Sequence, residues 1–155
     1  MLPENEVKQE WLLRYLHAKR RLNLASEILR ELITVGPKAI EYSDMPKGSP
    51  VLTGLEAQAV RLESQIEAVK RAEAYRDQMY REVSEAVYEL QNATQAEVMG
   101  YRYLAYKRTP YELLNGLDGT LQRGWEEIAE IMGYSVDRVA HIHGEALANI
   151  KVDRQ

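Results

Sequence analysis

The chain has 155 residues, of which 28% are charged and 45% are hydrophobic, and its net charge is −4. This composition excludes a disordered chain and predicts a soluble, globular protein, and the length predicts one or two small domains. There is no cysteine, which excludes disulfide and thiolate chemistry and is typical of a reducing, cytoplasmic location. No apolar run approaches the roughly 18 residues of a membrane span, and the first ten residues are too polar for a signal peptide, so no membrane association is expected.

The stretch 5–35 predicts one long helix. Its apolar residues are spaced alternately four and three apart, as in a heptad seam, and such a seam requires a partner surface. The seam consists of Trp11, Tyr15, Ala18, Leu22, Ala25, Leu29 and Leu32.

The stretch 36–54 contains three prolines and three glycines, which predicts a linker long enough for the chain to reverse direction. A second long helix is predicted at 55–91, behind a capping box formed by Thr53 and Glu56. Its seam is Leu55, Ala59, Leu62, Ile66 and Val69, then Tyr80, Val83, Val87 and Leu90, with Glu73 and Arg76 interrupting it. The two helices predict an antiparallel hairpin or coiled coil over residues 1–92.

The predicted second helix is longer than the first, so one end of it needs another partner. Either the C-terminal part of the chain packs on that end, or a second subunit does. Two heptad seams also make intermolecular coiled-coil pairing an alternative to a purely intramolecular hairpin. We therefore expect a homodimer.

A boundary is expected at Asn92-Ala93-Thr94, where helical propensity is interrupted, and 94–155 is predicted to be a separate helical module. Its first helix is expected at 95–107, with Thr94 opening a second capping-box pattern. The stretch 106–124 contains a proline and three glycines, which predicts a loop with a short helix at 110–114.

Residues 125–150 have the pattern of two short helices joined by a tight turn. Gly133 can adopt the left-handed backbone that the turn needs, and the Ser135 hydroxyl can cap the second helix. Ala129 is small enough for the two helices to cross closely. The remaining structural positions are apolar, as a packed unit requires: Trp125, Ile128, Met132, Tyr134, Val139 and Ile142. The sequence therefore predicts an all-α fold that ends in a helix–turn–helix.

This helix–turn–helix resembles region four of bacterial sigma factors. The matching residues are WEEIAEIMGYS at 125–135, then Arg138-Val139, Ile142 and Ala146-Leu147. The chain is most similar to phage-encoded regulators of the ArpU/RinA kind, which join a sigma-like C-terminal module to a long helical N-terminal part. The stretch 44–49 also resembles that group. The resemblance implies a sigma-like, non-catalytic transcriptional regulator from a bacteriophage that binds promoter DNA, alone or beside RNA polymerase.

The second helix of the unit is the predicted reading helix. One stripe of it is apolar and expected to be buried, which leaves the opposite face for base edges in the major groove. Arg138 can bind a guanine or a phosphate, and His141 can bind a purine edge; Asp137 can accept from cytosine N4, and Val136 can contact a thymine methyl. With two phosphate-contact candidates beyond the helix, the DNA-binding residues are Val136, Asp137, Arg138, His141, Lys151 and Arg154.

The charge of the module limits this prediction. From Gln95 onward, seven Lys and Arg residues stand against nine Asp and Glu residues. Because phosphate neutralisation supplies most of the non-specific affinity, we expect weak binding to double-stranded DNA by one copy alone. A continuous positive strip joining Arg138 and Lys151 with residues such as Arg102, Lys107 or Arg123 would support DNA binding strongly.

The alternative is a non-catalytic coiled-coil adaptor that uses the helix–turn–helix for protein–protein contact. The acid excess and the sparsely basic reading helix favour it. We expect no enzymatic activity, because the sequence has no nucleophile motif such as Gly-x-Ser-x-Gly. No cofactor is expected, because no Gly-rich loop follows a strand. No metal is expected either, since His141 and His143 are two apart on a helix and point to different faces.

Overall fold

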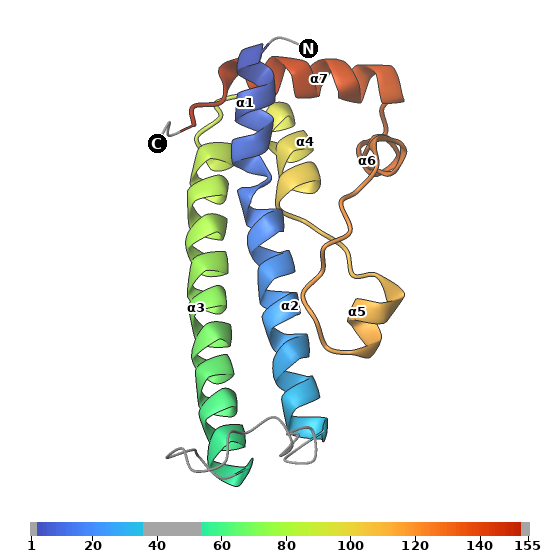
Figure 1. Cartoon of the computed structure of the whole chain (residues 1–155). Helices are drawn as coiled ribbons and strands as arrows, with labels where there is room; N and C mark the ends of the chain where they lie inside the picture. The colour runs from blue at the N-terminus through green and yellow to red at the C-terminus, as the bar shows by residue number, and fades with distance from the viewer. Residues whose placement is uncertain (1–2, 36–53, 153–155) are drawn as a thin grey trace.

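The computed structural model describes residues 3–35 and 54–152, and every regular element in these ranges is an α-helix (Figure 1). The helices are α1 (Pro3–Leu12), α2 (Arg14–Val35), α3 (Gly54–Tyr88), α4 (Ala93–Tyr103), α5 (Pro110–Leu114), α6 (Trp125–Met132) and α7 (Val136–Asn149). The predicted all-α fold is confirmed. Within these ranges no helix has the length and apolar character to cross a membrane. The predicted linker, apart from Gly54, lies outside the described residues, as does the stretch 44–49.

The predicted single helix at 5–35 is divided into α1 and α2. It begins earlier than expected, at Pro3, a residue that suits the first turn because its missing N–H needs no partner there. The division falls at Leu13, where Leu13 N donates to Gln9 O at 2.9 Å and His17 N donates to Leu13 O at 3.0 Å. These bonds keep the helical spacing, so the two segments follow each other almost without interruption.

Helices α2 and α3 lie side by side and antiparallel (Figure 1). The buried core of this pair lies at the end nearest α1. There α1 and α2 bury Leu12, Tyr15 and Ala18 against residues of α3 from Met79 onward. Helices α4 and α7 complete this core cluster with Met99, Tyr103, Ala146, Leu147 and Ile150. The C-terminal part of the same chain therefore covers the end of α3, which is one of the two arrangements that the unequal helix lengths allowed.

The predicted bounds of the third and fourth helical stretches need correction. Helix α3 ends at Tyr88, three residues before the expected end. Helix α4 starts at Ala93 and ends at Tyr103, whereas 95–107 was expected. The cap is Asn92 in place of Thr94, because the Asn92 side chain accepts from Gln95 N at 3.1 Å. Asn and Asp are the better N-cap residues, so the earlier start is physically reasonable.

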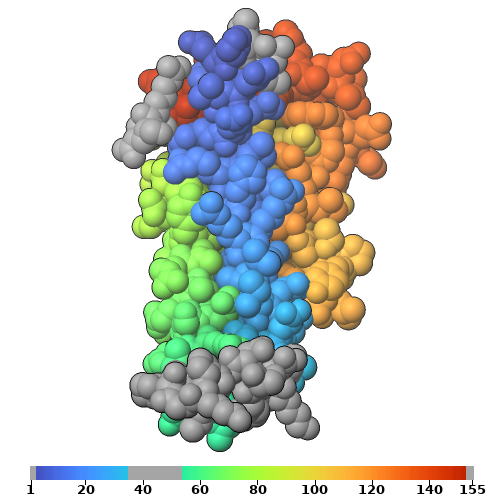
Figure 2. Space-filling model, in the orientation of Figure 1, coloured from blue at the N-terminus to red at the C-terminus, as the bar shows by residue number. Residues whose placement is uncertain are grey.

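The stretch 104–124 packs against α2 and contains the predicted short helix α5 (Figure 1). Asn23 of α2 holds it with two bonds to one residue: Asn23 Nδ2 donates to Asp118 O, and Asp118 N donates to Asn23 Oδ1, both at 2.9 Å. Arg76 of α3 adds an ion pair to the Asp118 carboxylate at 2.9 Å. In the space-filling view this stretch lies against α2 (Figure 2).

Candidate nucleic-acid interface

A small buried cluster joins α4, α6 and α7. It contains Val98 of α4, Ile128 and Ala129 of α6, and Val139 and Ile142 of α7. Trp125, Met132 and Tyr134 pack against the cluster and are partly buried. The predicted structural positions of the helix–turn–helix thus pack together, and α4 supplies the third side.

The turn between α6 and α7 has the predicted backbone. Gly133 has φ 72° and ψ 31°, and its N–H bonds back to the end of α6. A side chain at this φ would be strained, so glycine is favoured here. Ser135 caps α7 by accepting from Arg138 N at 3.2 Å. Gly124 caps α6 without a side-chain bond, and Glu126 and Glu127 occupy the first turn.

The first half of α7 presents an exposed face. Val136, Asp137, Arg138 and His141 are all exposed, with Val136 at 41%. The opposite stripe is buried, including Val139 at 0%. The four residues predicted to read bases therefore lie on the outer surface.

Two of these side chains contact a residue four positions away in the sequence. The Arg138 guanidinium lies 3.9 Å from the centre of the Tyr134 ring, a cation–π contact that limits its freedom. His141 Nε2 lies 2.7 Å from Glu145 Oε1, so a carboxylate sits beside the predicted purine contact. The sequence prediction missed both partners, although the spacing of four residues within α7 could have indicated the His141–Glu145 pair.

The basic residues whose grouping with Arg138 would support DNA binding mostly contact partners inside the module. The Arg102 guanidinium packs 4.2 Å from the centre of the Trp125 ring, and its Nη1 donates to Arg123 O at 2.6 Å. Arg123 and Lys107 both pair with Glu127 Oε1, at 2.8 and 3.1 Å. Arg102, Arg123 and Lys107 are therefore each engaged with a group of α6 or of the loop before it.

The two predicted phosphate contacts are placed differently. Lys151 is exposed but lies beyond the far end of α7, about 20 Å along the helix from Arg138 at about 1.5 Å per residue. Arg154 lies outside the described residues. Lys151 therefore belongs to a different surface from the exposed first half of α7.

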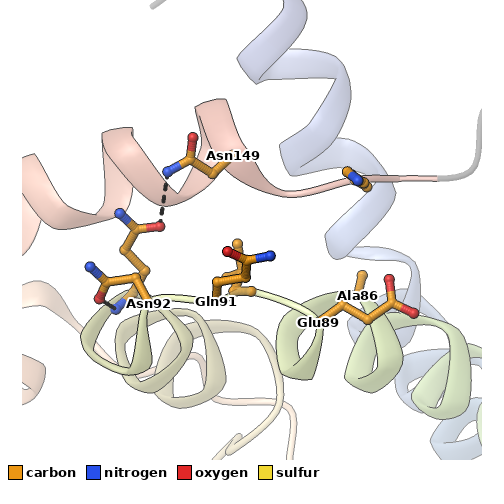
Figure 3. A pocket seen from close by; sticks show the side chains of 8 residues that line it. Ala86, Glu89, Gln91, Asn92 and Asn149 are labelled. Atoms are coloured by element: carbon orange, nitrogen blue, oxygen red, sulfur yellow. Dashed lines mark hydrogen bonds between the residues drawn. The ribbon is translucent and has the colours of Figure 1, made fainter.

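Lys151 lines a cavity of about 620 Å³ between the end of α3, the start of α4 and the end of α7 (Figure 3). Besides Lys151, its lining includes the Glu89 carboxylate and four amides: Gln91, Asn92, Gln95 and Asn149. Asn149 Nδ2 donates to Gln95 Oε1 at 3.1 Å across it. This bond joins the end of α7 to the start of α4.

His141 and His143 point to different faces of α7: His141 is exposed and His143 is buried. Within residues 3–35 and 54–152, no group of three or more His, Cys, Asp or Glu side chains is arranged to hold a metal ion. Comparison of the chain with protein-family models, with curated proteins and with solved structures finds no match.

Proposed function

We propose that this chain is a sequence-specific DNA-binding transcriptional regulator that places the first half of α7 in the major groove. The observation that carries the proposal is the exposure of Arg138 and His141 on α7, directly after a left-handed turn at Gly133. In helix–turn–helix proteins, the residues that contact bases lie at this end of the second helix. The sigma-like resemblance of the same residues agrees with this role.

The proposal requires phosphate contacts beyond those that one copy of the chain supplies. Arg138 is the only Lys or Arg within α7, and the cations of the preceding loop are engaged internally. One copy therefore makes few phosphate contacts, and affinity should depend on a second copy or on RNA polymerase already bound at the promoter. Cytoplasmic location and bacteriophage origin belong to the same proposal.

The test is a band-shift assay with the full chain and duplexes selected from a random-sequence library at low salt. Arg138→Ala and His141→Ala should each weaken binding to the selected duplex by roughly 5- to 150-fold, because a good base contact is worth about 1–3 kcal/mol. Arg81→Ala is the matched control. It removes one positive charge from an exposed position of α3, away from α7. It should leave binding unchanged.

Two results would contradict the assignment. If Arg138→Ala and His141→Ala bind the selected duplex as tightly as the unaltered chain, the first half of α7 is not the reading surface. If Arg81→Ala weakens binding as much as Arg138→Ala does, the interaction is non-specific. Circular dichroism of each variant checks that the helices are intact.

A second candidate is the non-catalytic adaptor, in which the exposed face of α7 contacts protein. The observation that favours it is the presence of Asp137 and Glu145 beside Arg138 and His141 on that face. It predicts no selection of any duplex from the library even at about 50 mM salt, together with co-sedimentation with purified bacterial RNA polymerase. A selected duplex that depends on Arg138 would exclude this candidate.

A further inference from the structure

Tyr134 is fixed in place just before α7. It follows Gly133 in the turn, and its backbone N–H donates to Ala129 O at 2.9 Å. Its side chain is partly buried and packs against the buried cluster of α4, α6 and α7. Both the backbone and the ring of Tyr134 are therefore held by contacts within the helix–turn–helix.

The Arg138 guanidinium lies over this ring, 3.9 Å from its centre. Long side chains of a helix point toward its N-terminal end, so a ring four residues earlier in the chain is within reach. Asp137 and Glu145 also lie on α7, but in the described residues neither is paired with Arg138, and Glu145 contacts His141 instead. The Tyr134 ring is therefore the contact that places the Arg138 charge at the N-terminal end of α7.

Stacking on a ring occupies a face of the guanidinium and leaves its edge for hydrogen bonds. The N–H donors of arginine lie in the plane of the group, so a ring over one face blocks none of them. Guanine presents two acceptors, O6 and N7, at its major-groove edge, and a planar fork of two N–H groups matches this pair. An arginine that is ordered before binding also loses less conformational freedom when it meets the base.

We propose that Tyr134 is a positioning residue for Arg138 and that the base read by Arg138 is a guanine. This inference rests on the proposed function, because it names a base that α7 contacts. Tyr134 acts through Arg138 and touches no base itself. Arg138→Lys would keep a charge for phosphate but would remove the planar fork that stacks on the ring and bonds to both guanine acceptors. The Tyr134–Arg138 pair therefore determines specificity more than total affinity.

The contact is tested first in the full chain without nucleic acid, by proton NMR. The ring should shift the resonances of the Arg138 Hδ protons upfield, and Tyr134→Phe, which keeps a ring, should retain this shift. Tyr134→Leu keeps an apolar side chain against the buried cluster but has no ring, so the shift should disappear. The methyl resonances of Val139 and Ile142 show whether that cluster stays packed. Unchanged Arg138 resonances in Tyr134→Leu would overturn the contact.

The base is tested with the duplex that the full chain selects, by replacing each guanine in turn with 7-deazaguanine, which lacks the N7 acceptor. At one guanine the replacement should weaken binding of the unaltered chain and of Tyr134→Phe, and it should have no effect on Arg138→Ala. In Tyr134→Leu the ratio of the two affinities should fall by about two- to five-fold, as loss of an exposed cation–π contact predicts. Arg138→Lys should lose discrimination at this guanine while its affinity keeps the same dependence on salt.

The possible failures are distinguishable from one another. If no duplex is selected, the proposed function fails and the guanine assignment fails with it, whereas the NMR shift still decides whether the contact exists. If a duplex is selected through Arg138 but no guanine replacement is coupled to Arg138, the assigned base is wrong. If Tyr134→Leu discriminates the guanine as well as the unaltered chain does, or better, Tyr134 does not position Arg138 for reading.

Discussion

At the scale of single residues, His143 is a buried titratable side chain. It is 5% exposed and lies between the rings of Tyr103 and Trp125. Tyr103 Oη lies 2.8 Å from His143 Nε2 and also accepts from Gln9 Nε2 at 3.2 Å. The phenol proton is therefore free to be donated to a neutral imidazole. Burial, with a smaller contribution from the nearby Arg102 cation, lowers the pKa of His143 from 6.5 to about 4.

This lowered pKa makes the stability of the fold depend on pH. The unfolded chain binds a proton at His143 near pH 6.5, whereas the folded chain resists it until about pH 4, so stability is lost as the pH falls through that window. The loss attributable to His143 is up to about 3 kcal/mol, at about 1.36 kcal/mol per pKa unit. Denaturant titrations of the unaltered chain and of His143→Gln between pH 7 and pH 4 measure it. The difference between their unfolding free energies should shrink towards pH 4. A difference that stays constant with pH would show that the imidazole is not held neutral.

At the scale of elements, the stretch 104–124 is held in place by polar contacts to α2. Asn23→Ala removes both bonds to Asp118 and leaves a partly buried N–H and C=O without their partners. An unmade buried hydrogen bond costs about 1–3 kcal/mol, so we expect a destabilisation of that size. Hydrogen exchange should show the loss of protection at Asp118. His17→Ala, at an exposed position of α2, is the control and should change neither measurement. Equal protection in Asn23→Ala would mean that the loop is held by other contacts.

Elements governed by local spacing could be predicted from the sequence. The turn at Gly133 and the cap at Ser135 were correct, because backbone φ preferences and short-range capping decide them. The short helix α5 was also correct. Thr109 and Glu112 bond to each other's backbone in a capping box, and this pattern in the sequence is a further signal for the start of α5.

Features that depend on tertiary contacts could not be predicted in the same way. The division at Leu13 follows no proline or glycine in the sequence. The engagement of Arg102 with Trp125 joins residues 23 positions apart, and the pairing of Lys107 with Glu127 joins residues 20 positions apart. A count of charges treats Arg102, Lys107 and Glu127 as independent surface groups. For this reason the sequence located the exposed face of α7 but did not reveal these internal contacts of the basic residues.

At the scale of the whole molecule, α7 connects two buried clusters. Its first half packs in the cluster with α4 and α6, and its second half packs in the cluster with α1, α2 and α3. Lys8 of α1 strengthens the second contact, because its Nζ donates to Leu147 O at 2.8 Å and to Ala148 O at 3.2 Å near the end of α7. A cation at this end of a helix is also favoured by the helix dipole. A rigid helix shared by both clusters should make them unfold together.

The two tryptophans allow that expectation to be measured, because each packs against a different cluster. Trp11 lies against the cluster of α1, α2 and α3, and Trp125 lies against the cluster of α4, α6 and α7. Trp125→Phe leaves Trp11 fluorescence as a probe of the first cluster, and Trp11→Phe leaves Trp125 as a probe of the second. In each variant, the remaining tryptophan and far-ultraviolet circular dichroism should report the same denaturant midpoint, as one cooperative transition requires.

Leu147→Ala, which empties space in the first cluster, should lower stability by roughly 2–5 kcal/mol and shift both fluorescence transitions together. If Leu147→Ala moves only the Trp11 transition, the C-terminal module folds independently of the α2–α3 pair, and α7 does not couple them.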